Sequence, residues 1–318
     1  MTEFGYALSS EEHGPIELVE YAARAERAGF EFALISDHYH PWTDSQGQSP
    51  FVWSVIGGIA RETERLRLGT GVTCPTIRIH PAIVAQAAAT SASMMPGRFF
   101  LGVGTGENLN EHVVGEGWPS ADERLAMLAE ALEVMRLLWQ GGEQTHRGEF
   151  YDVEDARLYT LPEEPVEVAV AAAKPNAADL AGRMGDALIN TAPDADIIGR
   201  FDDAGGTGKP RYGGITCCWA TSEEEGAKTA SEIWPNAALG GDLGQELPRP
   251  ENFEQATQWV TAEAIAEKIP CGPDPERFVE DIRVYEEAGY THVYFHQVGY
   301  DQDGFFRFWT EELAPRLS

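Results

Sequence analysis

Short apolar runs alternate with amphipathic segments from one end of the 318-residue chain to the other. Runs rich in β-branched and aromatic residues predict buried strands, whereas apolar positions at three- and four-residue spacing predict helices. The predicted strands are Phe4–Leu8, Phe32–Ser36, Leu66–Thr70, Phe99–Val103, Val166–Ala171, Ala187–Asn190, Gly214–Trp219 and His292–Phe295. The clearest predicted helices are Pro15–Ala28, Trp53–Thr63, Pro81–Met94 and Asp122–Trp139.

This alternation predicts an α/β protein built as one (β/α)8 TIM barrel. Two segments, Ala25–His38 and Tyr285–Gln297, both run from a helix through a glycine and an aromatic residue into a strand with a polar end. Such an internal repeat favours a barrel over a doubly wound sheet. No linker with a shift in composition divides the chain, so we predict a single domain over residues 1–318.

Two segments interrupt the alternation of strands and helices. Gly141–Leu161 has the pattern of a β-hairpin that leaves the barrel. Trp234–Val260 is rich in Pro, Gly and Gln, and we interpret it as an insertion into a loop that follows a strand. In barrels such insertions shape the access of substrate to the site.

The chain carries 52 acidic and 23 basic residues, which gives a formal net charge of −29. So negative a protein is repelled by nucleic acids and anionic lipids, so we expect neither as a partner. Few of its cations are lysines: these are Lys174, Lys209, Lys228 and Lys268. Excess carboxylates with few lysines are typical of proteins adapted to molar salt, and we predict a halophilic protein rather than an ordinary acidic one.

The four cysteines, Cys74, Cys217, Cys218 and Cys271, form neither a zinc-type CxxC pair nor a disulfide ladder. The first residues lack the basic and apolar regions of a signal peptide, and no apolar run reaches about 18 residues. We therefore expect a cytoplasmic protein.

Barrel active sites are assembled from residues just past the C-terminal ends of the strands. The segment after Phe32–Ser36 contributes Asp37, His38 and Trp42 within SDHYHPW, and Phe99–Val103 runs into the glycine-rich GVGTGENLNEH with Glu107. A histidine, carboxylates, an indole and glycine-rich turns predict a pocket for a planar or phosphorylated ligand.

Simpler interpretations of the same residues stay open. His38 could be a structural histidine, and Glu107 could merely cap a helix. His38 and His40 also form the HxH pair of metal-dependent barrel hydrolases, with His296 and Lys174 at other strand ends. That pair normally follows the first strand, however, and no ligand aspartate follows the last one. We therefore favour a site without a metal.

The motifs SDHYHPW, GTGVTCPT, RFFLGVGTGENLNEH and AGRMGDALINTA resemble the luciferase-like barrel superfamily. Within it, the likeness is to the coenzyme F420-dependent glucose-6-phosphate dehydrogenase group, and it extends to the terminal FWTEELAPRL. The resemblance implies coenzyme F420, a deazaflavin, as the cofactor and a small molecule as the substrate. We also expect a homodimer.

The resemblance implies roles for individual positions. Asp37 and His38 would face cofactor and substrate, and Trp42 would line the reacting face. The other implied cofactor contacts are Gly71 and Val72, joined by a non-prolyl cis peptide bond in the family, then Cys74, Thr105, Gly106, Glu107 and Asn110 around the ring, and Ala173, Lys174, Asn176 and Ala177 in the loop that holds the phosphate tail. Cys74 replaces a threonine of the family and Lys174 replaces a glycine.

Moving a hydride from a hydroxyl-bearing carbon to a deazaflavin requires a base for the hydroxyl proton and an acid for the ring. We assign the base to His38, since free imidazole has a pKa of about 6.5, and the acid to Glu107, with Trp42 steering the substrate. The two assignments could be exchanged. An FMN-dependent luciferase-like monooxygenase and a non-catalytic deazaflavin-binding protein remain alternatives.

The likeness weakens where the family holds the substrate phosphate with a threonine, two lysines and an arginine. Thr191 matches the threonine, but Asp194 stands at one lysine position and Lys268 at the arginine position. The second lysine falls in Trp234–Val260, which contains no lysine. Because Asp194 would repel a phosphate, we favour an unphosphorylated sugar or alcohol as the substrate.

Overall fold

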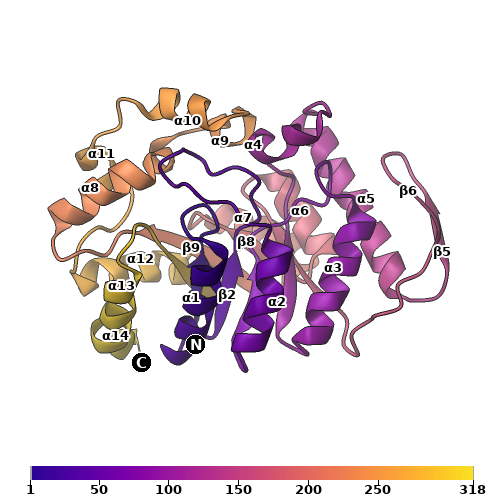
Figure 1. The fold of residues 1–318 in the computed structure, drawn as a ribbon, viewed down its shortest axis with the longest axis horizontal. Coiled ribbons are helices and arrows are strands. Elements are labelled where there is room, and N and C mark those ends of the chain that lie inside the picture. Colours follow the sequence, from indigo (N-terminus) through magenta and orange to yellow (C-terminus); the bar gives the residue numbers. More distant parts are fainter. Residues whose placement is uncertain (1, 318) are drawn as a thin grey trace.

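Eight parallel strands close into a barrel in the computed structural model, which describes residues 2–317. The order around the barrel is β1-β10-β9-β8-β7-β4-β3-β2, and β2 pairs with β1 to close it. The strands are β1 (Glu3–Leu8), β2 (Phe32–Ile35), β3 (Arg67–Thr70), β4 (Phe99–Val103), β7 (Glu167–Ala171), β8 (Ala187–Asn190), β9 (Arg211–Cys217) and β10 (His292–Gln297). The predicted (β/α)8 TIM barrel is confirmed (Figure 1).

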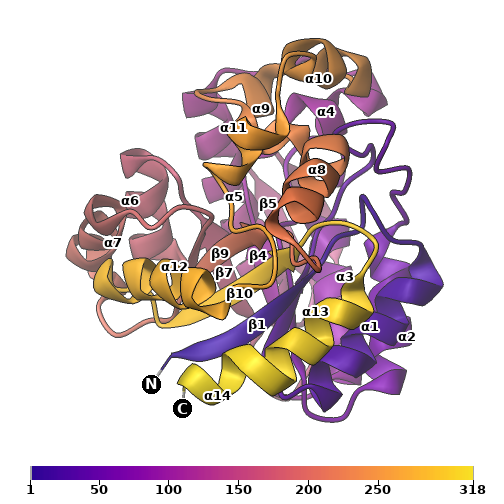
Figure 2. The same ribbon diagram turned by 90° about the vertical axis from the view of Figure 1, so that its left-hand side faces the viewer.

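Helices surround the barrel, and their buried faces pack against the outside of the strands (Figure 2). Those between β1 and β7 are α1 (Pro15–Arg27), α2 (Val52–Glu62), α3 (Pro81–Met94), α4 (Asn108–Glu111), η1 (His112–Val114) and α5 (Ala121–Trp139). Those that follow β7 on the outside are α6 (Pro175–Met184), α7 (Ala195–Phe201), η2 (Asp202–Gly206), α12 (Pro275–Glu287), α13 (Gln302–Phe308), η4 (Trp309–Leu313) and α14 (Ala314–Leu317).

The internal repeat predicted from the sequence is visible in the backbone. Helices α1 and α12 are each followed by a glycine in the left-handed region, Gly29 with φ 88° and Gly289 with φ 97°. In both places a buried aromatic residue comes next, Phe30 and Tyr290, and the chain then enters a strand. Only glycine adopts this φ without strain, so both helices end at the same kind of turn.

Aromatic rings fill the half of the barrel nearest the starts of the strands. Phe100 stacks on Tyr212 with ring centroids 5.2 Å apart, and Phe32 meets the edge of Tyr212 at 5.1 Å. All three side chains are fully buried. They pack the interior at this end, and the cavity described below lies toward the C-terminal ends of the strands.

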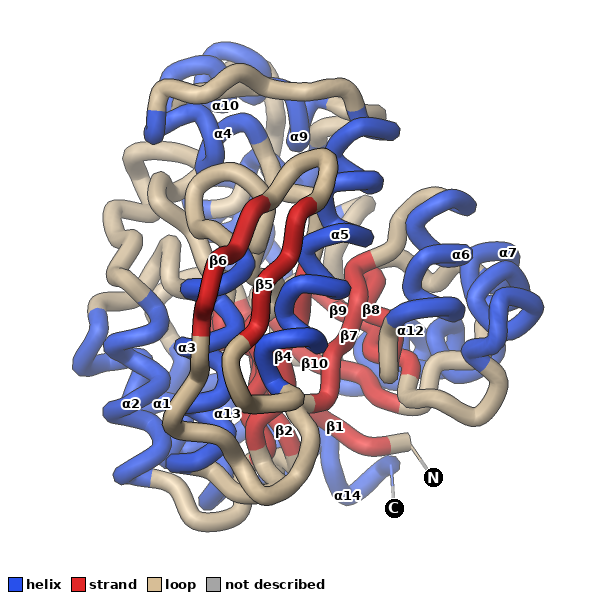
Figure 3. The backbone as a smooth tube through the Cα atoms, turned by 90° about the vertical axis from the view of Figure 1, so that its right-hand side faces the viewer, coloured by secondary structure: helices blue, strands red, loops and turns tan. Residues whose placement is uncertain are grey.

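The predicted hairpin is present as β5 (Gln144–Arg147) and β6 (Asp152–Ala156), which pair antiparallel beside α5 (Figure 3). The carboxylate of Glu130 on α5 accepts hydrogen bonds from the backbone amides of Phe150 and Tyr151. This contact ties the hairpin to the barrel's helical layer, away from the open end of the strands.

The segment after β9 forms a roof over the open end (Figures 1 and 2). We call residues 223–266 the roof; it consists of α8 (Glu223–Ile233), η3 (Pro235–Ala238), α9 (Leu243–Glu246), α10 (Pro250–Thr257) and α11 (Ala262–Ala266). The predicted insertion Trp234–Val260 is thus largely helical. The roof shares an apolar cluster, separate from the barrel core, with Cys218 and Cys271, which are joined by an isolated β-bridge.

All four cysteines are buried free thiols. Within residues 2–317, we find no helix with both the length and the apolar character needed to cross a membrane.

Candidate active site

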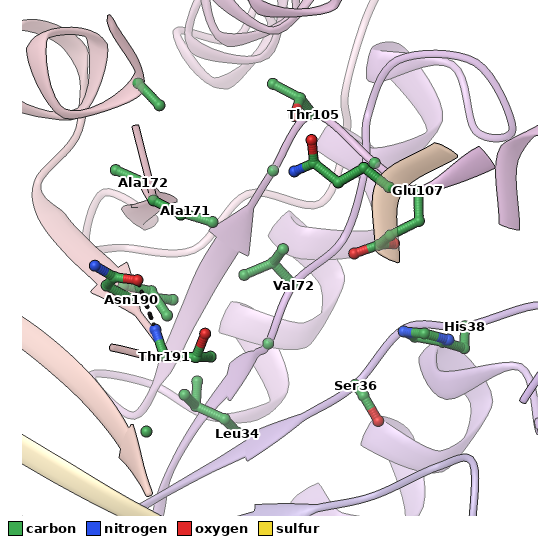
Figure 4. A pocket seen from close by; sticks show the side chains of 18 of the residues that line it. Leu34, Ser36, His38, Val72, Thr105, Glu107, Ala171, Ala172, Asn190 and Thr191 are labelled. Atoms are coloured by element: carbon green, nitrogen blue, oxygen red, sulfur yellow. Dashed lines mark hydrogen bonds between the residues drawn. The ribbon is translucent and has the colours of Figure 1, made fainter. Parts of the chain in front are cut away.

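A cavity of about 780 Å³ lies at the C-terminal ends of the barrel strands, beneath the roof. Most of the residues predicted from the sequence line it, namely His38, Trp42, Gly71, Val72, Thr105, Gly106, Glu107, Ala173, Lys174, Asn176, Ala177 and Thr191. Figure 4 shows His38 and Glu107 on one side of the cavity, Asn190 and Thr191 on the other, and Val72 between them. The peptide bond between Gly71 and Val72 is cis.

Three predicted cofactor residues, Asp37, Cys74 and Asn110, lie buried behind this lining instead of in it. Asn110 accepts hydrogen bonds from the backbone amides of Tyr39 and His40 at 2.8 and 3.2 Å, and its amide donates to Glu107 Oε2 at 3.2 Å. Asn110 therefore holds the Glu107 side chain and the loop after β2 in fixed positions.

Asp37 belongs to a buried charge network with Arg78 and Glu111. Arg78 Nη2 lies 2.9 Å from Asp37 Oδ1, and Thr73 donates to Asp37 Oδ2 at 2.8 Å. The backbone amide of Arg78 also donates to Glu111 at 2.7 Å. Burial raises the pKa of Glu111 to about 7, although Arg78 partly offsets this effect. The network is structural support behind the cavity, and the sequence analysis did not find Arg78 or Glu111.

His38 is held on both ring nitrogens. Nδ1 lies 3.1 Å from the carbonyl oxygen of His40, which can only accept, so we assign a hydrogen to Nδ1. Nε2 lies 3.3 Å from Glu11 Oε1. A carboxylate also accepts, so the two groups can share one proton. The Trp42 ring packs beside the imidazole at a centroid distance of 5.0 Å.

Glu11 and His38 form a buried pair of a carboxylate and an imidazole. The side chain of Glu11 is almost fully buried, and Ser36 and Ser9 donate hydrogen bonds to Oε2 at 2.5 and 3.2 Å. Burial by itself raises the pKa of Glu11, but the charge of His38 and the hydrogen bond from Ser36 hold it below its ordinary value. The ionised carboxylate therefore stabilises a protonated His38 ring.

The sequence analysis missed Glu11, although the signal was present. The polar segment SSEE directly follows the first predicted strand. Residues just past the C-terminal end of a barrel strand are candidates for the active site, as at the other strands.

Glu107 does not cap a helix with its side chain, although it directly precedes α4. It lines the cavity, so the interpretation of Glu107 as a helix cap is wrong. His38 likewise lines the cavity and is not merely a core histidine.

Lys174, Asn176 and Ala177, from the loop at the start of α6, line the cavity, and the first amides of α6 have no partners within their own helix. Lys174 Nζ pairs with Asp242 Oδ1 at 2.6 Å. Arg124 from α5 lines the cavity with only 1% of its surface exposed, and its buried Nε has no hydrogen-bond partner within residues 2–317. Its Nη1 donates to the Pro119 carbonyl oxygen at 2.6 Å and its Nη2 lies 3.6 Å from Glu246, so Nε is the donor left for an anionic group of a ligand. The cavity thus suits a ligand with a planar part and an anionic tail.

Neither Asp194 nor Lys268, the positions predicted beside Thr191, lines the cavity. Asp194 is exposed and caps α7, accepting from the backbone amides of Asp196 and Ile197, so it does not line the cavity as the sequence interpretation assumed. Lys268 is exposed beyond α11, and it is not among the residues that line the cavity.

Two further arginines near Thr191 in the sequence are engaged elsewhere. Arg200 pairs with Asp179, and Arg211 pairs with Asp202, each at 2.6 Å. Among residues 2–317, the lysine and arginine side chains that line the cavity are Lys174 and Arg124.

The residues of the HxH pair do not converge. Nδ1 of His40 faces the carbonyl oxygen of Leu109 at 3.0 Å, whereas His38 faces Glu11. Over the described range 2–317, no group of three or more His, Cys, Asp and Glu side chains could hold a metal ion. This geometry gives the metal-hydrolase interpretation no support.

Comparison with known proteins identifies relatives along the whole chain. The family model described as luciferase-like monooxygenase matches residues 1–292. The F420-dependent glucose-6-phosphate dehydrogenase of Segniliparus rotundus is 38% identical over 335 residues, covering 99% of this chain and 98% of the relative. That of Nocardia farcinica is 37% identical over 329 residues, with 99% and 98% covered.

Solved structures of F420-dependent enzymes are similar to this chain over nearly its whole length. An F420-dependent secondary alcohol dehydrogenase in complex with an F420-acetone adduct superimposes with a TM-score of 0.90 at 30% identity, covering 98% of this chain and 97% of that one. The coenzyme F420-dependent tetrahydromethanopterin reductase from Methanopyrus kandleri, at 19% identity and a TM-score of 0.80 over 100% of this chain and 99% of that one, shares the fold.

Proposed function

Because the chain belongs to the luciferase-like monooxygenase family, and its relatives along the full length are F420-dependent dehydrogenases, we propose that it is a coenzyme F420-dependent dehydrogenase of a sugar or secondary alcohol. The observation that carries the proposal is the cavity that His38 and Glu107 share with Lys174 and Arg124. Coenzyme F420 held in this cavity would supply the acceptor for the hydride of the substrate carbon.

The residues present fit this cofactor. Around the ring we assign Gly71, Val72, Thr105 and Gly106, with Asp37, Cys74 and Asn110 supporting them from behind. For the phosphate tail we assign Ala173, Lys174, Asn176 and Ala177, and we add Arg124, whose free Nε is the buried polar atom that such a group would satisfy.

The pairing with Glu11 favours His38 as the base. With Glu11 ionised and the ring neutral, Nε2 of His38 can take the hydroxyl proton, and the carboxylate then stabilises the imidazolium. We assign Glu107, in an orientation set by Asn110, as the acid that would give a proton to the deazaflavin ring. Trp42 confines the substrate next to His38.

The decisive test is a fluorescence titration with F420, FMN and NADP, followed by an assay with sugars and secondary alcohols. We expect tight binding of F420 and weak binding of the other two. Micromolar binding of FMN with none of F420 would favour a monooxygenase instead. Binding of F420 without turnover of any alcohol would favour a non-catalytic deazaflavin-binding protein.

We expect glucose to be oxidised with a higher kcat/KM than glucose 6-phosphate. A bound phosphate needs charge-assisted hydrogen bonds, each worth about 1.5–3 kcal/mol, and none of Lys268, Arg200 and Arg211 lines the cavity. The difference should therefore reach roughly tenfold or more. Loss of F420 absorbance reports both rates. A wide preference for glucose 6-phosphate would show that backbone amides or Lys174 supply the missing charge.

We further propose that the protein is halophilic, as the charge of −29 suggests. In dilute buffer the Debye length is about 30 Å at 0.01 M, so 52 carboxylates against 23 cations repel one another across the surface. Molar KCl should raise both the melting temperature and the activity. Sucrose serves as the uncharged control. An equal melting temperature in dilute buffer would refute the halophilic proposal without affecting the enzymatic one.

We also propose a cytoplasmic location and a homodimeric assembly. Sedimentation of the purified protein measures the assembly directly.

A further inference from the structure

The loop after β1 carries two successive buried carboxylates, Glu11 and Glu12, and each is paired with a histidine. Glu11 contacts His38, which follows β2, and Glu12 contacts His296 on β10. Strand β1 lies between β10 and β2 in the barrel, so the two pairs flank its end. Both imidazoles line the same cavity. The mechanism proposed above uses only the first pair.

His296 has a partner at one ring nitrogen, whereas His38 has a partner at both. Nε2 of His296 lies 3.1 Å from Glu12 Oε2, and Glu12 Oε1 accepts from the backbone amide of Gly299 at 2.9 Å. The Trp234 ring packs against the imidazole at 4.4 Å in an edge-on arrangement. Within residues 2–317, Nδ1 of His296 has no hydrogen-bond partner. Because Nε2 donates to the carboxylate, Nδ1 of the neutral ring is an acceptor.

Thr216 supplies a second polar group at the same place. It is the partner of His296 in the parallel register of β9 and β10, and it also lines the cavity. Its hydroxyl forms no side-chain hydrogen bond to any other residue in the described chain, and a hydroxyl both donates and accepts. Together, Nδ1 of His296 and Oγ1 of Thr216 offer what an alcohol group needs: an acceptor for its hydrogen and a donor for its oxygen.

We propose that His296 and Thr216 bind a second hydroxyl group of the substrate, so that the enzyme selects polyhydroxylated substrates such as sugars over alcohols with a single hydroxyl. This inference rests on the proposed function, since His38 must receive the hydroxyl that is oxidised. A site built to hydrogen-bond a substrate hydroxyl rejects the analogue that lacks it, because its polar groups then lose water without gaining a partner.

The test compares kcat/KM for glucose and for 2-propanol in the F420 assay, in wild type and two variants. His296→Gln keeps an N–H that reaches Glu12 but removes the acceptor at Nδ1; Thr216→Val keeps the shape but removes the hydroxyl. In each variant the loss of kcat/KM should be about 10–100-fold for glucose and at least about tenfold smaller for 2-propanol. The matched control is His292→Gln: His292 lies on the same strand and pairs with Glu3 at 3.3 Å, but at the opposite end of the barrel. This substitution should leave the ratio of kcat/KM for glucose to kcat/KM for 2-propanol unchanged.

The outcomes separate this inference from the proposed function. Equal losses for glucose and 2-propanol in both variants, or a wild type that oxidises both equally well, would overturn the second hydroxyl site while leaving an F420-dependent dehydrogenase in place. Absence of turnover with every alcohol would overturn the proposed function. In that case, tryptophan fluorescence with F420 present decides the inference: glucose binding that His296→Gln weakens supports it, and no glucose binding overturns it. If His296→Gln does not fold, judged by thermal melting, Thr216→Val alone decides.

Discussion

Replacing His38 by alanine should lower kcat by about 10²–10⁴-fold, the range for loss of a general base, while the affinity for F420 stays close to that of wild type. The physical reason is that the proposed proton acceptor is Nε2 of His38, next to Glu11, whereas the assigned cofactor contacts come from other strand ends. Steady-state rates and a fluorescence titration on the same preparations measure the two effects separately.

The matched control is His40→Ala, two residues along the same loop. The ring of His40 faces the Leu109 carbonyl and does not line the cavity, so its removal should cost little activity. Wild-type rates in the His38 variant would refute the assignment of the base. Loss of F420 binding in that variant would mean that His38 has a structural role.

Replacing Glu11 by glutamine should lower kcat by roughly 10²–10³-fold, because the imidazolium formed at His38 then loses its buried counter-charge. Without the carboxylate the ring is a weaker base, so the acid limb of the kcat/KM profile should move to lower pH. A purely structural role for Glu11 would reduce the rate without moving this limb. Glu17→Gln, on the exposed face of α1, is the control that removes one carboxylate and leaves the dyad intact.

The lowered pKa of Glu11 also predicts how the stability of the fold changes with pH. Because the pKa of Glu11 in the folded protein lies below its ordinary value of 4.5, the folded state binds fewer protons here than the unfolded state as the carboxyl titrates. Its contribution to stability is therefore present above that ordinary value and is lost as the pH falls through the lowered one. Denaturant melts of wild type and Glu11→Gln between pH 6 and pH 3, values chosen to bracket about 4.5, should converge at the acidic end.

The sequence predicted the barrel well where local pattern and packing agree. Pro81–Met94 and Phe99–Val103 have the bounds predicted for them, because the helix opens with a proline and the strand is apolar throughout. The strand predicted over Gly214–Trp219 instead begins at Arg211. Pairing with Leu188 on the neighbouring strand sets its start, and this register has no local signal.

Some residues of the candidate site could likewise be predicted from local sequence motifs, and others could not. Strand-end motifs identified His38, Trp42 and Glu107, which the fold brings to one cavity. Arg124 carries no such signal, because it belongs to an ordinary amphipathic helix and reaches the cavity only through the packing of α5.

The roof was predicted only as an insertion. Its helices α9 and α11 have 4 and 5 residues, too short to show a helical period in the sequence. The roof is held by contacts far along the chain, such as the hydrogen bond from the Asn108 side-chain amide to the Glu246 carbonyl of α9 and the packing of Phe253 of α10 against Trp42.

The separate apolar cluster beneath the roof has an evolutionary consequence. Its side chains come from α8, α11 and the Cys218–Cys271 bridge, whereas the barrel has its own core. Trp234, Asn236 and Gln245 reach the cavity from this unit, and the cofactor loop at Lys174 belongs to another. We therefore expect substitutions in the roof to disturb the barrel core less than substitutions within that core. A lineage can exchange one substrate range for another by rebuilding this module while it inherits the hydride chemistry unchanged.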